Sequence, residues 1–98
     1  MQSVTKESLR KKKRDIEQIA RKHGAYNIRI FDSVARGEAH PGSDLDLLID
    51  MESGRSLLDH IALIQDLEAY LGCRVDVVTE RSLKERLKKR ILADSIPL

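Results

Sequence analysis

Apolar residues recur along the chain with two different periods. The three- to four-residue spacing of an amphipathic helix occurs in residues 6–22, 56–71 and 83–92. Short runs rich in β-branched and aliphatic residues, typical of strands, occur in residues 28–31, 44–50 and 75–79. Helical and strand-like segments therefore alternate, which predicts an α/β (α+β) fold in which helices pack against a small mixed β-sheet.

Residues that begin and end helices stand near the ends of these segments. Thr5 can cap the first helix and Gly24 can end it, while Gly72 can end the second. Ser82 and Glu85 have the spacing of a capping box, so we expect the last helix to begin there.

Three segments allow more than one interpretation. The clearest apolar stripe belongs to the second helix, and we expect it to pack in the core rather than against a partner: Leu57, Leu58, Ile61, Ile64, Leu67 and Leu71. The basic run over residues 10–14 is interpreted as a solvated helix face, with docking of an acidic partner or RNA as the alternative. The apolar tail over residues 96–98 could be disordered, cover the core or contact a partner.

The composition indicates one small, charged domain over residues 1–98. Lys and Arg number 18 against 16 Asp and Glu, and a net charge of +2 with 3% aromatic residues argues against strong direct nucleic-acid binding. No apolar stretch approaches the roughly 20 residues of a membrane span, and no signal peptide is found, so we expect a cytoplasmic protein without membrane contact. The single Cys73 excludes an internal disulfide.

Two acids, Asp44 and Asp46, flank Leu45 at the start of the second strand-like run. Side chains two residues apart point to the same face of a strand, so these carboxylates would project together. Like charges at this separation repel, and Mg²⁺ binds such carboxylates while completing its coordination with substrate phosphates. The pair predicts a metal site, where two ions about 3.5–4 Å apart could serve phosphoryl or nucleotidyl transfer.

A third acid, Asp76, stands in the middle of the strand-like residues 75–79. It could complete the metal site if its strand lies beside the strand of Asp46. The alternative is a solvated position on an edge strand. The three histidines do not have the spacing of metal ligands: His23, His40 and His60.

Residues 31–37 are typical of a turn that leads from a strand into a short helix. Ser33 can cap that helix, and the free N–H groups of a helix N-terminus bind phosphate readily. A triphosphate could therefore rest on this turn. Arg36 could neutralise phosphate charge or form a surface ion pair, and Gly37 would end the short helix.

The turn and the acids together resemble the signature of the DNA polymerase beta nucleotidyltransferase superfamily, in which a Gly-Ser turn is followed, after a short helix, by Asp-x-Asp. The chain is most similar to the smallest branch, the minimal nucleotidyltransferases (MNT), known as the antitoxins of HEPN/MNT toxin–antitoxin pairs. The similarity covers nearly the whole chain, from the turn to the tail.

The resemblance implies a nucleotidyltransferase fold and an enzyme that transfers AMP from ATP to a tyrosine of a HEPN ribonuclease toxin, its partner in a hetero-oligomer. It implies two Mg²⁺ or Mn²⁺ ions, bound by the catalytic acids Asp44, Asp46 and Asp76. Four further residues are expected in the nucleotide-binding site: Ser33, Arg36, Ser43 and Asp32.

One position departs from the family pattern, because Asp32 stands where the family has glycine. Glycine lets the backbone approach phosphate closely. A negative charge beside a triphosphate would cost on the order of 1–4 kcal/mol, so we expect Asp32 to weaken nucleotide binding. An alternative function is therefore a weak or inactive module that neutralises the toxin by binding it. A metal-independent RNA-binding protein that uses the two basic helices is a third interpretation.

Overall fold

The structure is a computed structural model that describes residues 5–31 and 45–98. Its elements are α1 (Lys6–Lys11), α2 (Lys13–Lys22), β1 (Ala25–Phe31), β2 (Leu45–Met51), α4 (Leu57–Leu71), β3 (Val75–Thr79), the 3₁₀ turn η1 (Glu80–Ser82), α5 (Glu85–Asp94) and β4 (Ile96–Pro97). The predicted mixture of helices and a small mixed sheet is confirmed.

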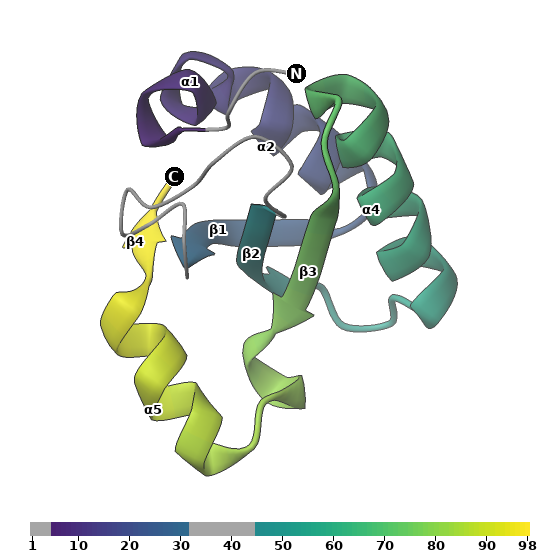
Figure 1. The fold of residues 1–98 in the computed structure, drawn as a ribbon. Coiled ribbons are helices and arrows are strands. Elements are labelled where there is room, and N and C mark those ends of the chain that lie inside the picture. Colours follow the sequence, from purple (N-terminus) through teal and green to yellow (C-terminus); the bar gives the residue numbers. More distant parts are fainter. Residues whose placement is uncertain (1–4, 32–44) are drawn as a thin grey trace.

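Four strands of the described chain form one sheet in the order β3-β2-β1-β4. β1 runs antiparallel to β2 and β4, whereas β2 and β3 are parallel. α4 provides the crossover that a parallel pair requires. In Figure 1, α1, α2 and α4 lie at the top and right, and α5 stands apart at the lower left.

One face of the sheet forms the main core. Three alternate residues of β2 and two of β3 are buried on this face: Leu45, Leu47, Ile49, Val75 and Val77. The helices contribute Leu9, Ile16, Ala20, Leu63 and Leu67 to the same cluster. Because side chains alternate along a strand, the acids of β2 lie on the opposite face.

The first helix is not continuous, contrary to the prediction over residues 6–22. It breaks at Lys12, whose backbone torsions (φ −101°, ψ 7°) close α1 and open α2. Both pieces reach the core across this break, since Leu9 of α1 and Ile16 of α2 are each 1% exposed.

The helix ends are correctly predicted at three positions. The Thr5 hydroxyl accepts the Ser8 N–H at 3.1 Å and caps α1. Gly24 follows α2 with φ +81°, and Gly72 ends α4 with φ +69°, a left-handed conformation that glycine adopts without steric cost.

The capping box predicted for Ser82 and Glu85 does not form. Ser82 lies in η1, where its hydroxyl donates to the Thr79 carbonyl at 2.8 Å. α5 begins at Glu85 with Lys84 as the preceding cap residue, which makes no side-chain cap bond. The hydroxyl is used by the local turn, an alternative that short polar side chains often take.

α4 buries less of its apolar surface than predicted. Leu63 and Leu67 are at most 1% exposed, but Leu57 and Leu58 are 72% and 76% exposed, and Ile61 is 43% exposed. The helix is apolar on more than one side, whereas only one side can face the sheet. The expectation that the whole stripe lies in the core is therefore wrong for the first turns of α4.

The C-terminal tail covers the core. Ile96 and Pro97 pair with β1, and Leu98 is 8% exposed, with its N–H bonded to the Ile28 carbonyl at 3.1 Å. Of the alternatives for this tail, the structure shows a cap on the core. Across the described ranges, no helix has the length and apolar character needed to cross a membrane.

Candidate active site

Two of the three predicted metal-binding acids lie side by side on neighbouring parallel strands. Asp46 of β2 and Asp76 of β3 are Cα partners, with Leu45 beside Val75 on one side of the pair. Directly paired residues point to the same face of a sheet, and neighbouring strands lie about 4.8 Å apart. The fold therefore brings together two acids that are 30 positions apart in the sequence.

These acids lie on the face of the sheet opposite the main core. Asp46 is half-buried and Asp76 is exposed, and Phe31 at the end of β1 is the Cα partner of Asp46. α1, α2 and α4 cover the other face, so a substrate can approach both acids only from this side. β3 is an edge strand of the described sheet, which makes Asp76 both a solvated edge residue and a neighbour of Asp46.

The other predicted site residues lie outside the described residues: Asp32, Ser33, Arg36, Ser43 and Asp44. Their roles in nucleotide and metal binding stay predictions. Asp44 directly precedes Leu45, the residue at which β2 begins.

The described part of the site contains two of the oxygen-bearing side chains that a hard divalent cation prefers. Two carboxylates beside each other on adjacent strands repel, and both supply the oxygen ligands that Mg²⁺ prefers. Within residues 5–31 and 45–98, no group of three or more His, Cys, Asp and Glu could hold a metal ion. A complete site would need a further ligand from elsewhere in the chain, such as Asp44, or from a substrate.

A second polar cluster at the far end of the same strands was not predicted. Arg29 of β1 lies 3.6 Å from the carboxylates of both Asp50 and Glu80, and Lys88 of α5 lies 3.4 Å from Glu80. The Arg29 side chain is only 14% exposed. This cluster ties α5 and η1 to the sheet. A single arginine inside an apolar strand was the signal that could have indicated it.

Two side chains of α4 support the outer edge of β3, the strand that carries Asp76. The Glu68 carboxylate accepts the Val75 N–H at 3.0 Å, and His60 Nε2–H donates to the Val77 carbonyl at 2.8 Å. Both contacts satisfy backbone groups at an edge of the described sheet, on either side of Asp76. No local sequence pattern indicates these positioning residues, because their contacts join distant segments of the chain.

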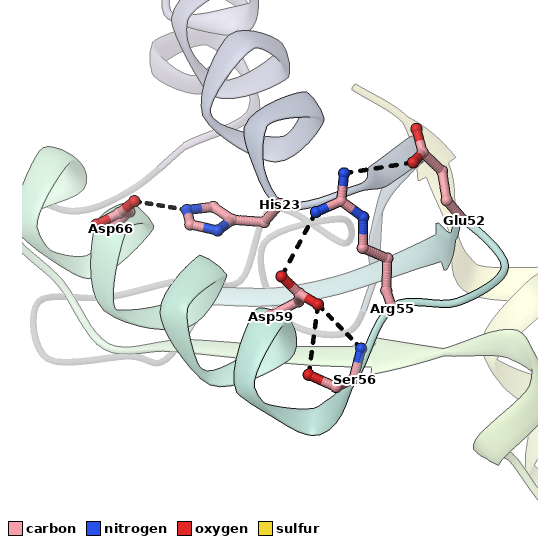
Figure 2. A network of polar contacts seen from close by, with 6 residues as sticks. All are labelled: His23, Glu52, Arg55, Ser56, Asp59 and Asp66. Carbon is pink, nitrogen blue, oxygen red and sulfur yellow. Dashed lines mark hydrogen bonds and ion pairs between the residues drawn. The ribbon is translucent and has the colours of Figure 1, made fainter.

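Figure 2 shows the polar contacts that fix α4 to its surroundings. His23 Nε2 and Asp66 Oδ2 are 2.6 Å apart, which joins the end of α2 to α4. Asp59 accepts the Ser56 N–H at 2.9 Å and lies 3.5 Å from Arg55. The Ser56 N–H lowers the pKa of Asp59, and Arg55 lowers it further against the opposing effect of desolvation. These contacts anchor the helix that holds the edge of β3.

Sequence similarity to known proteins extends over most of the chain. Residues 8–98 match the Nucleotidyltransferase domain family. The chain is 44% identical over 84 residues to a candidate protein adenylyltransferase of Methanocaldococcus jannaschii, MJ0435, covering 86% of this chain and 90% of the relative. It is 41% identical over 80 residues to the protein adenylyltransferase MntA of Thermococcus cleftensis, covering 82% and 81% of the two chains.

Solved structures share the fold. A candidate minimal nucleotidyltransferase superposes with a TM-score of 0.86 and 48% identity, covering 97% of both chains. More distant is a toxin–antitoxin complex with AMP-PNP, with a TM-score of 0.74 and 23% identity over 86% of this chain and 69% of that chain. Another is the complex of an MNT antitoxin with a tri-AMPylated HEPN toxin of Shewanella oneidensis, with a TM-score of 0.68 and 19% identity over 90% and 69%.

The four-stranded mixed sheet, with Asp46 and Asp76 paired on the face opposite the main core, has the nucleotidyltransferase fold of these structures. The chain belongs to the Nucleotidyltransferase domain family and, within it, to the minimal nucleotidyltransferases. The resemblance found in the sequence is thereby confirmed.

Proposed function

We propose that this chain is an antitoxin that transfers AMP from ATP to a hydroxyl group of a HEPN-family toxin. The observation that carries the proposal is the pairing of Asp46 with Asp76 on the face of a nucleotidyltransferase fold opposite the main core. The protein adenylyltransferase MntA among the relatives and the AMPylated toxin in a distant neighbour support the same reaction. Because the substrate is ATP, we place the reaction in the cytoplasm.

Asp46 and Asp76 would bind Mg²⁺, or Mn²⁺, together with Asp44. Two such ions would polarise the α-phosphate and neutralise the charge of the leaving group. Asp76 would also orient the acceptor hydroxyl and take its proton. The acceptor oxygen then bonds to the α-phosphorus while the bond to the bridging oxygen breaks, and pyrophosphate leaves with that electron pair. The predicted phosphate contacts are Ser33, Arg36, Ser43 and Asp32.

We propose a tyrosine as the acceptor residue, in a hetero-oligomer of this chain with its toxin. A phenol has a pKa near 10, so at neutral pH it keeps its proton and needs a base to become a strong nucleophile. A carboxylate beside a divalent cation can orient such a hydroxyl and accept its proton. Asp76 is the more exposed of the two described acids, which suits contact with a large acceptor.

A binding-only antitoxin is the second candidate function, and Asp32 is the observation that favours it. An acid in place of the family glycine adds negative charge where the triphosphate is expected. If nucleotide binding is lost for this reason, neutralisation of the toxin would come from covering it. The two candidates make different predictions for one experiment.

The test is transfer of label from α-labelled ATP, with Mg²⁺, to the HEPN-family protein encoded beside this chain. The unaltered chain is compared with Asp32→Gly and with the double variant Asp44→Asn/Asp46→Asn. Transfer by the unaltered chain that the double variant abolishes would establish the adenylyltransferase. Transfer only after Asp32→Gly would support the binding-only antitoxin, and no transfer by any of the three would refute the AMP-transfer proposal.

A further inference from the structure

α5 lies beside the face of the sheet that carries Asp46 and Asp76, which we call the acid-bearing face. Glu80 of η1 links α5 to β1, because this carboxylate pairs with both Lys88 of α5 and Arg29 of β1, and α5 also packs against β1. No residue of α5 is fully buried, and the apolar side chain of Leu87 is 47% exposed. An amphipathic helix normally buries its apolar side against the core. α5 therefore keeps apolar surface available next to the candidate active site.

A pocket of about 150 Å³ lies between α5 and the end of β1. Phe31 lines one side of the pocket. The other four lining residues come from one side of α5, because they are spaced three or four positions apart: Leu87, Arg90, Ile91 and Asp94. Phe31 is the Cα partner of Asp46, which places the pocket beside the candidate catalytic acids. A cavity of about this volume is known to take one benzene ring.

We propose that this pocket receives an aromatic side chain of the acceptor protein and that α5 is the surface on which this protein docks. The inference rests on the proposed function, because it concerns the acceptor of that reaction. The acceptor hydroxyl must reach Asp46 and Asp76, and the opposite face of the sheet is covered by α1, α2 and α4. A protein that approaches the acids therefore meets α5.

The charge of α5 indicates the chemistry of the docking segment. The exposed side chains of α5 include three cations and one acid, and the cap residue Lys84 adds a fourth cation: Arg86, Lys89, Arg90, Glu85 and Lys84. An aromatic residue flanked by acidic residues complements this surface, since the ring enters the pocket while the acids meet the cations. The volume suits a single six-membered ring, such as the phenol of tyrosine, better than a whole adenosine. We therefore assign the pocket to the acceptor and not to the nucleotide.

The test uses the double variant Leu87→Glu/Arg90→Ala and a matched control, Leu58→Glu/Arg14→Ala. The control also replaces an exposed leucine and an exposed arginine, with the same change in charge, but on α4 and α2. Affinity for the HEPN-family protein is measured by calorimetry, affinity for a fluorescent ATP analogue with Mg²⁺ by titration, and the KM for the protein acceptor by AMP transfer. Thermal melting shows whether each variant is folded. If the variant with Leu87→Glu has a much lower melting temperature, the single variants Leu87→Ala and Leu58→Ala are compared instead.

We expect the α5 variant to raise the Kd and KM for the acceptor about ten-fold or more, while the Kd for the nucleotide stays within about two-fold. The control should leave all three values unchanged. A loss of nucleotide affinity in the α5 variant would assign the pocket to the nucleotide and overturn the proposal. The proposal would also be overturned if the unaltered chain did not bind the HEPN-family protein, or if the control lowered this affinity as much as the α5 variant.

The two proposals can fail separately. Binding of the HEPN-family protein that depends on α5, without any AMP transfer by the unaltered chain, would refute the enzymatic function and leave the docking surface intact. AMP transfer that the α5 variant leaves unchanged would refute the docking surface and leave the enzymatic function intact.

Discussion

The two faces of the sheet alternate residue by residue along the same strands, yet they differ in composition and exposure. On one face, Leu45 and Leu47 of β2 pack under the helices and are at most 2% exposed. On the other, Asp46 is half-buried and Asp76 is exposed. Leu48 lies on this second face and is fully buried, so the acid-bearing face is not open along its whole length.

The residues that stabilise the fold and the candidate catalytic acids therefore lie on opposite faces of one short pair of strands. Burial of the aliphatic face stabilises the fold through the hydrophobic effect, at about 25 cal/mol per Å² of apolar surface removed from water. The paired acids on the other face oppose stability, because like charges on adjacent strands repel. Substitutions on the two faces should therefore affect stability and AMP transfer separately.

The largest effect is expected for Asp76→Asn. This change removes one of two paired carboxylates, and loss of several kcal/mol of transition-state stabilisation would lower AMP transfer on the order of 10³-fold. The melting temperature should stay equal or rise slightly, because repulsion with Asp46 is relieved. Label transfer and thermal melting measure the two quantities on the same sample. A marked fall in melting temperature would mean that Asp76 is needed for folding and that the two faces do not act separately.

The next largest effect is expected on the covered face, for Leu63→Ala in α4. Leu63 is fully buried, so the substitution should lower the free energy of unfolding by about 2–5 kcal/mol. Leu58→Ala in the same helix is the matched control, since Leu58 is 76% exposed and should change stability by no more than about 0.5 kcal/mol. Urea denaturation measures both. Equal costs would contradict the packing of α4, and reduced nucleotide affinity in folded Leu63→Ala would show that the two faces are coupled.

A smaller effect is expected for Gly24→Ala, with Gly54→Ala as its control. Both glycines have positive φ, +81° and +87°, so alanine is strained at each by about 1–2 kcal/mol. Only at position 24 would the new Cβ overlap the side chain of Arg55, which must then leave its carboxylate partners. Losing these exposed ion pairs should add about 0.5–1 kcal/mol, seen as a lower urea midpoint than for Gly54→Ala. Identical midpoints would show that Arg55 moves without cost.

Local signals were sufficient to predict most of the fold. Thr5, Gly24 and Gly72 act within one turn of their helices, and the alternation in β2 placed Asp46 on the face opposite Leu45 from the sequence alone. The break between α1 and α2 and the exposure of the first turns of α4 were not predictable in this way. Both depend on which side of a helix meets the rest of the chain, and a helix with apolar residues on several sides does not specify that.

The acids of the candidate site were predictable from the sequence, but the residues that hold their strands in place were not. The sequence placed Asp76 in a strand, and the parallel register then set it beside Asp46. Glu68 and His60, which hold the edge of β3, could not be found, because each bonds a backbone group of a strand formed later in the chain. Residues that act through distant backbone groups have no characteristic spacing.

The smallest expected effect concerns the pH dependence of stability through Asp59, a residue remote from the acid-bearing face. The Ser56 N–H and Arg55 lower its pKa in the folded state below the usual value of about 3.9. A depressed folded pKa means that the contribution to stability is present above the unfolded value and is lost as pH falls through the folded one. Asp59→Asn should therefore flatten the decline in unfolding free energy below about pH 4, measured by urea denaturation. AMP transfer near neutral pH should not change. If the unfolding free energy of the variant declines at low pH as steeply as that of the unaltered chain, Asp59 has the same pKa in the folded and unfolded chains. A change in AMP transfer would show that the polar contacts of α4 influence the candidate active site on the opposite face of the sheet.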